Sequence, residues 1–338
     1  MRAKPLKLNR AGLLAIAYAF FVIFFPWDAV SRGGFSDFNV YIEYFDIFKN
    51  SSQSKDSMAE IYKFTSLTQY FINEVAWFEL VRLLNSVTDD SAISLRIISF
   101  FILFVWGLIT FKRVSYGVAL LFLLNPFVVD VAMSGIRNGL AWSLVMLGLM
   151  TQSKWLRAVL FLTGIFVHST TLVLVIIYYL TKLAIRFISG KPLLLVGLGA
   201  GICLGLALTV FNELVLGTIG DRRSGANYVV GSDSFKQASI WAILLYFQCM
   251  SSSYYIRKNI FVIALLAWYQ IMNPFIPSSY RIWAALLPVV ALSVMDLPAR
   301  KRQIFLYLYS GYLVLQYLYW TKLFYYWYTL CTSFPISA

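Results

Sequence analysis

One segment of the chain combines a charge, two glycines and an apolar context in a way that suits phosphate binding. In Ser134-Gly135-Ile136-Arg137-Asn138-Gly139-Leu140-Ala141, Arg137 stands between two glycines at the start of a long apolar run. A charge in such a run is costly beside lipid and needs a reason. The first turn of a helix adds free amide donors and the positive end of the helix dipole, so an arginine there can hold a diphosphate without a metal. The alternatives are that Arg137 snorkels to the membrane interface or pairs with a carboxylate such as Asp130.

His168 follows about thirty residues later and is the single histidine of the chain. It lies in Phe166-Val167-His168-Ser169-Thr170 between two apolar runs, where it could act as a base or as a hydrogen-bond donor. The alternative is a structural histidine that bonds a backbone carbonyl. One histidine without a cysteine or carboxylate cluster gives no reason to expect zinc, so no metal site and no cofactor are predicted.

Other charged residues fall near the same side of the membrane once the chain is threaded through it. Arg281 opens an apolar run after Pro277-Ser278-Ser279-Tyr280, and Arg222 and Arg223 lie in a polar loop. These residues lie in different parts of the chain, so their convergence with Arg137 and His168 is the main functional indication. Three acids could face the same mouth, as direct participants, as arginine partners or as exposed loop charges: Asp37, Glu74 and Asp130.

The composition places the chain among polytopic membrane proteins. Hydrophobic residues make up 60% of the 338 positions and charged residues only 13%, which no soluble core could absorb. The net charge of +13 comes from basic residues spread along short loops, a pattern that indicates membrane topology rather than nucleic-acid binding. We therefore predict an all-α integral membrane protein with about 11 transmembrane helices, within a range of 10 to 12.

The spans follow from the apolar runs, and the basic loops orient them. Arg2, Lys4, Lys7 and Arg10 precede the first span, which places the N-terminus in the cytoplasm. With alternating sides, the cytoplasmic loops carry more than half of the 28 basic residues but only one of the 15 acids, Asp296. The expected spans are 11–27, 92–111, 114–131, 135–150, 155–167, 169–185, 193–216, 238–255, 260–276, 282–297 and 304–320.

Residues 1–338 are expected to form one transmembrane domain with two external loops. The first loop, 28–90, holds most of the acids and includes an amphipathic helix with Ile61, Phe64, Phe71, Val75 and Phe78 on one face, which either packs against the protein or covers a cavity. The second, 217–237, is rich in glycine and serine and is expected to be mobile. Gly197, Gly201 and Gly205 recur every four residues, a spacing that lets another helix approach closely.

Several function classes are excluded or not indicated. No nucleophile elbow, Walker loop or dinucleotide-binding glycine motif occurs, so hydrolase, ATPase and dinucleotide functions are not indicated. The three cysteines, Cys203, Cys249 and Cys331, show no paired spacing and indicate neither a disulfide framework nor a metal site. The first apolar run lacks a cleavage site and is expected to be a retained span.

Three stretches resemble the EpsG-type branch of membrane polysaccharide polymerases, which includes many Wzy-type O-antigen polymerases. The Ser134–Ala141 segment resembles the family's Gly-x-Arg-(Gln/Asn)-x-x-Ala segment, and Phe166–Thr170 resembles its histidine segment. Asp37-Phe38-Asn39-Val40-Tyr41, with Asn73-Glu74 onward, resembles its opening external loop, although Val75 stands where the family often has proline.

The resemblance implies a GT-C-like, all-helical glycosyltransferase of the bacterial inner membrane with its active site facing the periplasm. It implies undecaprenyl-diphosphate-linked oligosaccharides as donor and acceptor, surrounding membrane lipid, a chain-length regulator protein as a possible partner, and no nucleic acid. In this scheme Arg137 and Arg281 contact the diphosphate, Arg222 or Arg223 completes the clamp, and His168 activates the acceptor hydroxyl or orients a phosphate. Asp37, Tyr41 and Glu74 belong to the substrate-binding loop, where Asp37 or Glu74 binds the acceptor sugar or replaces His168 as base.

Three alternatives stay open at this level. An O-antigen ligase differs in its acceptor, which is lipid A core rather than another repeat unit. A lipid-linked oligosaccharide flippase or transporter would also expose arginines to a lipid diphosphate, but paired halves and charges within the spans are not found in the sequence. A membrane acyltransferase would place His168 and Arg137 on the cytoplasmic face, where acyl-CoA is available.

Overall fold

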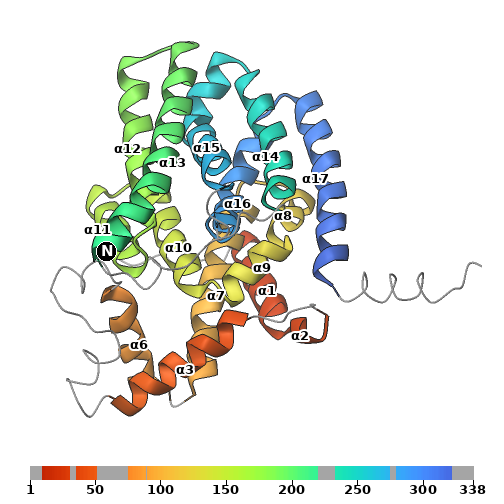
Figure 1. Ribbon diagram of the computed structural model, residues 1–338. Helices are drawn as coiled ribbons and strands as arrows, with labels where there is room; N and C mark the ends of the chain where they lie inside the picture. Colours follow the sequence, from red (N-terminus) through yellow and green to blue (C-terminus); the bar gives the residue numbers. More distant parts are fainter. Residues whose placement is uncertain are drawn as a thin grey trace, which may run out of the picture.

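The computed structural model describes residues 10–30, 36–51, 75–88, 90–219, 233–274 and 279–321, and every regular element among them is an α-helix (Figure 1). The all-helical fold expected from the sequence is therefore confirmed for these ranges. The helices are α1 Arg10–Phe24, α2 Trp27–Val30, α3 Ser36–Ser51, α6 Val75–Val87, α7 Ser91–Phe111, α8 Tyr116–Leu123, α9 Pro126–Met133, α10 Ile136–Met150, α11 Lys154–Val167, α12 Thr171–Phe187, α13 Pro192–Ile219, α14 Asp233–Cys249, α15 Ser253–Met272, α16 Ser279–Met295 and α17 Ala299–Trp320.

Apolar helices make the protein a candidate for membrane insertion. By length and composition, 91–111 and 192–209 could each cross a bilayer, and the bent pair α8 and α9 could form a third span. The 21 residues of α7 correspond to about 31 Å of helix, close to the thickness of a hydrocarbon core. Shorter apolar helices occur at 10–24, 136–150, 238–249 and 281–295. The number of spans stays a prediction.

The expected span 114–131 is not one straight helix. It divides into α8 and α9, which meet at an angle of 61°. Pro126 is the first residue of α9 and cannot continue the helix before it, while the Asn125 side chain accepts a hydrogen bond from the Phe127 amide at 2.9 Å and caps α9.

The expected span 238–255 was wrong at its end. α14 stops at Cys249, and Ser252 caps the next helix by accepting from the Tyr255 amide at 3.3 Å, so Tyr255 belongs to α15. The second expected loop is also shorter, because α13 continues to Ile219 and α14 begins at Asp233. The rest of that loop, 220–232, lies outside the described residues.

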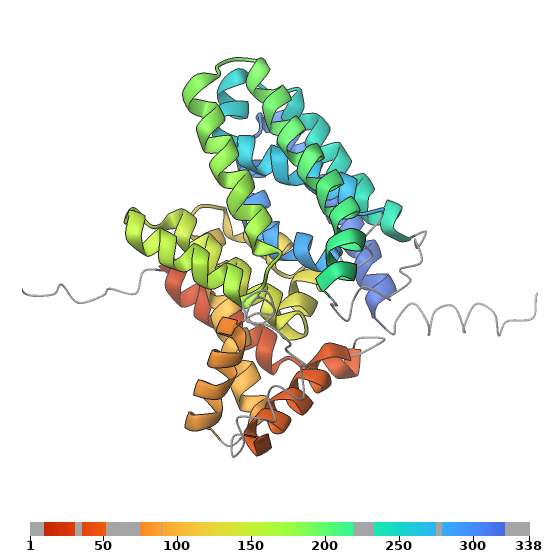
Figure 2. The same cartoon turned by 60° about the vertical axis from the view of Figure 1, so that its left-hand side comes forward.

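The first expected loop contains more helix than the sequence suggested. α3 and α6 lie together at one end of the molecule, at the bottom of Figures 1 and 2. α3 was not predicted, and the amphipathic pattern is described only from Val75 onward, in α6. Ile61, Phe64 and Phe71 lie outside the described residues.

Close helix pairs build the rest of the fold. α1 lies against α7, where a β-carbon at Gly107 would be only 3.2 Å from the Ala15 backbone. α13 packs along α15 through the predicted glycines: a β-carbon at Gly201 would lie 2.2 Å from the Ala264 carbonyl oxygen. The expectation that these glycines admit a neighbouring helix is confirmed.

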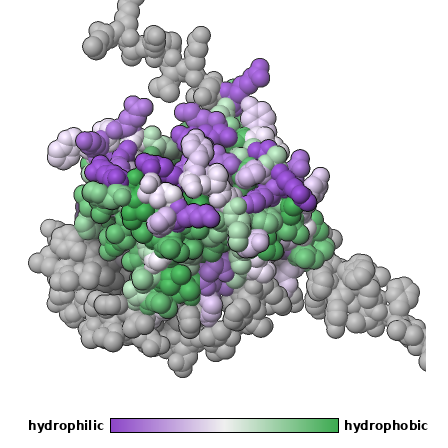
Figure 3. All heavy atoms as spheres, turned by 90° about the horizontal axis from the view of Figure 1, so that it is seen from above, coloured by the Kyte–Doolittle hydropathy of each residue, from purple (hydrophilic) through white to green (hydrophobic). Residues whose placement is uncertain are grey.

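Basic side chains gather at the end of the molecule opposite α3. Lys258 donates to Asp296 at 2.6 Å, Arg302 donates to the Met295 carbonyl at 3.0 Å, and Lys301 donates to the Met250 carbonyl. Arg113, two residues after the end of α7, lies within electrostatic range of Lys258. Figure 3 looks down on this end and shows hydrophilic side chains gathered across it.

Candidate functional site

The corner between α9 and α10 sets the position of Arg137. The Asp130 carbonyl accepts from the Ser134 amide at 2.6 Å and from the Gly135 amide at 3.3 Å, which ends α9 and turns the chain into α10. The Ser134 hydroxyl donates to the Asp130 carboxylate at 2.7 Å. Arg137 therefore stands in the first turn of α10, as the sequence predicted.

The flanking glycines serve packing in this structure. A β-carbon at Gly135 would lie 3.2 Å from Val131 Cα in α9, and one at Gly139 would lie 3.1 Å from Ile102 Cδ1 in α7. Both distances are tighter than ordinary contacts, so helices rather than an open ligand space surround these positions.

Arg137 meets α3 through Tyr41. Its Nε donates to the Tyr41 hydroxyl at 3.2 Å, and its guanidinium carbon lies 5.6 Å from the Tyr41 ring centroid. Tyr41 is itself buried, with its ring 5.7 Å from that of Trp77 in α6. The contacts of Arg137 with described residues include Tyr41 but not Asp130, whose carboxylate accepts from the Ser134 hydroxyl.

Arg281 contacts α3 one helical turn before Tyr41. It stands in the first turn of α16 and forms an ion pair with Asp37, in the first turn of α3. The Arg281 side chain is 28% exposed and that of Asp37 is 32% exposed, so solvent reaches the pair. Asp130 lies within electrostatic range of both charges.

The two arginines thus converge on one face of α3. Asp37 and Tyr41 are four residues apart on a helix, which places their β-carbons about 5–6 Å apart on the same side. The sequence identified all four residues as site candidates, and the structure brings them together.

His168 lies at the same end of the molecule as Arg137. α10 and α11 run antiparallel, because Arg157 Nε donates to the Gly148 carbonyl while a β-carbon at Gly164 would lie 3.0 Å from the Ala141 carbonyl. One further turn along each helix leads to Arg137 and His168. His168 is half-buried and ends α11, its amide donating to the Gly164 carbonyl, in the predicted turn between two short helices.

Three other predicted site residues cannot be placed. Arg222, Arg223 and Glu74 lie outside the described residues. Within the ranges that are described, no three histidine, cysteine or acidic side chains gather as metal ligands would.

The break between α8 and α9 contains a polar group that the sequence analysis did not single out. Asn125 is fully buried and donates to the Tyr309 hydroxyl at 3.0 Å and to the Gln316 side chain at 2.9 Å. Two further tyrosines cover the carbonyls freed by the break: Tyr18 donates to Leu123 at 2.8 Å, and Tyr317 donates to Leu124. The Asn125-Pro126 dipeptide inside an apolar run was the available signal.

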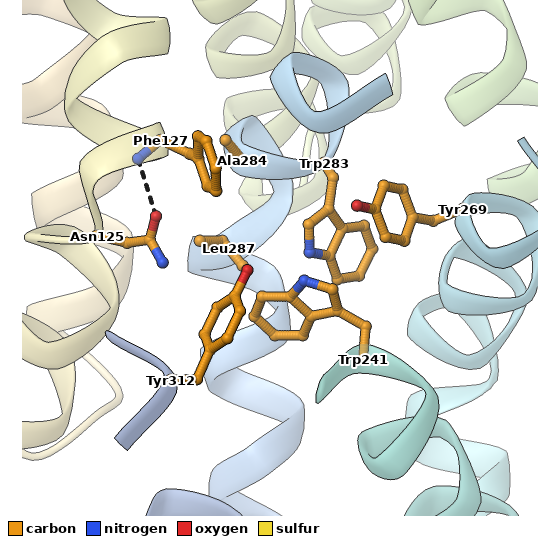
Figure 4. A pocket seen from close by; sticks show the side chains of 8 residues that line it. All are labelled: Asn125, Phe127, Trp241, Tyr269, Trp283, Ala284, Leu287 and Tyr312. Atoms are coloured by element: carbon orange, nitrogen blue, oxygen red, sulfur yellow. Dashed lines mark hydrogen bonds between the residues drawn. The ribbon is translucent and has the colours of Figure 1, made fainter. Parts of the chain in front are cut away.

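An aromatic pocket lies beside this break, between Asn125 and the rings of Trp241, Tyr269, Trp283 and Tyr312 (Figure 4). Its cavity is about 10 Å³, roughly the room that one water molecule needs. It is too small for a sugar, and the Arg137 and Arg281 cluster is the better candidate for a functional site.

Comparison with known proteins identifies no family for this chain, so its interpretation rests on the geometry of the site. No protein-family model matches the chain. No curated protein and no solved structure matches it either. The residues that meet at α3 therefore carry the functional argument.

Proposed function

We propose that the protein is a membrane glycosyltransferase that joins undecaprenyl-diphosphate-linked oligosaccharide repeat units into a polysaccharide. It acts at the periplasmic face of a bacterial inner membrane, through about eleven spans in a GT-C-like arrangement. The observation that carries the proposal is the pair of arginines, each in the first turn of its helix, that meet adjacent turns of α3.

The proposed chemistry needs these arginines because the leaving group is anionic. When the growing chain leaves its lipid carrier, negative charge develops on the departing diphosphate, and positive groups fixed in place stabilise that charge in the transition state. Guanidinium groups bind phosphate oxygens in a bidentate manner. Arg137 and Arg281 fill this role, and Arg222 or Arg223 would complete the clamp.

Acceptor activation requires a base near the arginines. His168 lies at the same end of the α10 and α11 pair as Arg137 and can accept the proton of the attacking sugar hydroxyl. Asp37, Tyr41 and Glu74 supply hydrogen-bonding groups for the acceptor sugar, with Asp37 or Glu74 as the alternative base. A chain-length regulator is the expected protein partner.

The distribution of charge supports an external site. The basic end, with Arg113, Lys258 and Arg302, has the composition of cytoplasmic loops. The Asp37 and Arg281 pair joins the first turns of α3 and α16, whereas Asp296 and the Met295 carbonyl mark the opposite end of α16. A lipid-linked diphosphate would reach Arg137 and Arg281 from that external side.

Loss of polymer in cells tests this function. Arg137→Ala and His168→Ala are each expected to abolish long-chain polymer, seen as a ladder on a gel, while protein level and attachment of single units stay normal. Arg257→Ala is the matched control, since Arg257 is exposed near the basic end. Normal ladders from both site variants would show that the site is assigned wrongly.

A further inference from the structure

Both candidate arginines are already engaged by α3. Arg281 pairs with Asp37, and Arg137 donates to Tyr41, one turn further along. The Asp37 carboxylate is therefore an anion on the guanidinium that the proposed function assigns to a phosphate.

We propose that Asp37 is a placeholder anion, which an incoming diphosphate displaces from Arg281 as the first turn of α3 moves away. This inference rests on the proposed function and adds a step to it: the site is held closed when empty and opens by ligand exchange.

The exchange is feasible because the ion pair is accessible. Both side chains are about 30% exposed, so a phosphate can reach Arg281 without unfolding the core. Ion pairs that water reaches contribute little net stability. A diphosphate accepts two parallel hydrogen bonds from a guanidinium, as a carboxylate does, but it carries more negative charge, so it competes well for Arg281.

The anchoring of α3 allows its first turn to move while its other half stays in place. Phe45 is fully buried, its carbonyl accepts from Asn85 at 3.1 Å, and Asp46 accepts from the Ser91 hydroxyl. In the first turns, by contrast, Asn39 and Val40 are exposed. The fixed half of α3 keeps the displaced carboxylate close to the site.

A second carboxylate remains near Arg281 when Asp37 leaves. Asp130 lies within electrostatic range of Arg281 and is itself held by the Ser134 hydroxyl at 2.7 Å. Asp130 belongs to α9, so it does not move with the first turn of α3. The charge of Asp130 therefore still acts on Arg281 when Asp37 is displaced.

Titration of the full chain, purified in detergent, tests the placeholder role with two probes, inorganic pyrophosphate and farnesyl diphosphate. Asp37→Asn keeps the shape of the side chain but removes its charge, and it is expected to bind pyrophosphate about two- to fivefold more tightly than the wild type. Asp37→Ala, a second variant that removes the acceptor, is expected to bind at least as tightly as Asp37→Asn. Unfolding temperatures establish that each variant is folded.

Two controls separate displacement from general electrostatics. Glu43→Gln removes a charge from an exposed position of the same helix and should leave affinity unchanged. Arg281→Gln should weaken binding by at least tenfold, and Asp37→Asn should give no gain in that background.

The two probes distinguish the source of the diphosphate. Tighter binding of farnesyl diphosphate than of pyrophosphate would support a lipid-linked ligand, and equal or weaker binding would overturn that source.

The outcomes distinguish this inference from the proposed function. If the wild type binds pyrophosphate through Arg281 and both Asp37 variants bind it equally or less well, the placeholder role is wrong and the diphosphate site stands. If neither the wild type nor the Asp37 variants bind either probe, both proposals fail.

Discussion

Arg137 and Arg281 engage α3 in different ways, and the difference predicts different sensitivities. Arg137 donates from Nε to the Tyr41 hydroxyl and lies over the aromatic ring, whereas Arg281 forms an ion pair with a carboxylate. The contact of Arg137 uses the planar shape of a guanidinium as well as its charge, which lysine does not reproduce.

Arg137→Lys is therefore expected to reduce polymer synthesis by more than about tenfold although the positive charge is kept. Tyr41→Phe removes only the hydroxyl and leaves the ring, so the loss should stay within about threefold. Polymer formed per unit of protein in isolated membranes measures both effects. Equal activity of Arg137→Lys and the wild type would show that only the charge matters.

At this scale the sequence identified the residues but not their partners. Arg137 stood out because a charge in an apolar run is costly, and His168 because it is unique. The contacts of Arg137 with Tyr41 and of Arg281 with Asp37 join positions 96 and 244 residues apart, which no local pattern reveals.

The fold depends on helices that pack closely against each other. The α13 and α15 pair shows how small residues allow this close packing. Gly201 faces the backbone of α15, whereas a β-carbon at Gly199 would meet nothing within 4 Å. The two glycines are two residues apart on one helix and have opposite surroundings.

Gly201→Ala is expected to destabilise the protein by about 1–3 kcal/mol, because the added methyl group pushes α13 away from the Ala264 carbonyl. Gly199→Ala should be neutral or slightly stabilising, since alanine favours a helix and the space is open. Thermal unfolding in detergent compares them. Equal effects of the two substitutions would mean that α13 and α15 are not in close contact.

The bend between α8 and α9 is a second element that positions the site, because α9 leads directly into the corner before Arg137. Asn125→Ala removes the cap of α9 and leaves Tyr309 and Gln316 without their buried partner, at an expected cost of about 2–4 kcal/mol. Ser115→Ala, at an exposed N-cap that makes no side-chain cap bond, should change stability by less than about 0.5 kcal/mol. Matching losses of stability in both variants would contradict the account of the bend.

The sequence located most helices but not their boundaries at polar turns. Long apolar runs predicted α7 and α13 closely, because hydrophobicity alone decides such segments. α3 was missed because its charged residues, such as Asp37 and Asp46, suggested a loop, and packing of Phe45 on Trp77 stabilises it. The stop at Cys249 was missed because Met250, Tyr254 and Tyr255 continue the apolar run across the serines of the turn.

The whole molecule has two chemically distinct ends, and the proposed function requires them to face opposite sides of a membrane. Lys258, Lys301 and Arg302 mark one end, and the contacts of α3 with Arg137 and Arg281 mark the other. In the proposed orientation the basic end faces the cytoplasm, because cytoplasmic loops are enriched in lysine and arginine.

Labelling of single cysteines tests this orientation in a chain whose own three cysteines are replaced. Asn39→Cys, exposed on α3, is expected to react with a membrane-impermeant maleimide in intact cells. Tyr254→Cys, at a position that is 78% exposed, should react only after the cells are opened. The reverse pattern would place the arginines in the cytoplasm and favour a membrane acyltransferase.

In the proposed function, the arginine pair at α3 stabilises a diphosphate leaving group during polymerisation. The most direct test incubates the purified protein with a defined undecaprenyl diphosphate oligosaccharide and separates the products by size. A ladder of repeat units that is unaffected by a metal chelator and is lost in Arg137→Ala and Arg281→Ala is the predicted result. No product longer than the substrate would rule out polymerase activity, and an unchanged ladder from the two arginine variants would rule out their role in stabilising the leaving group.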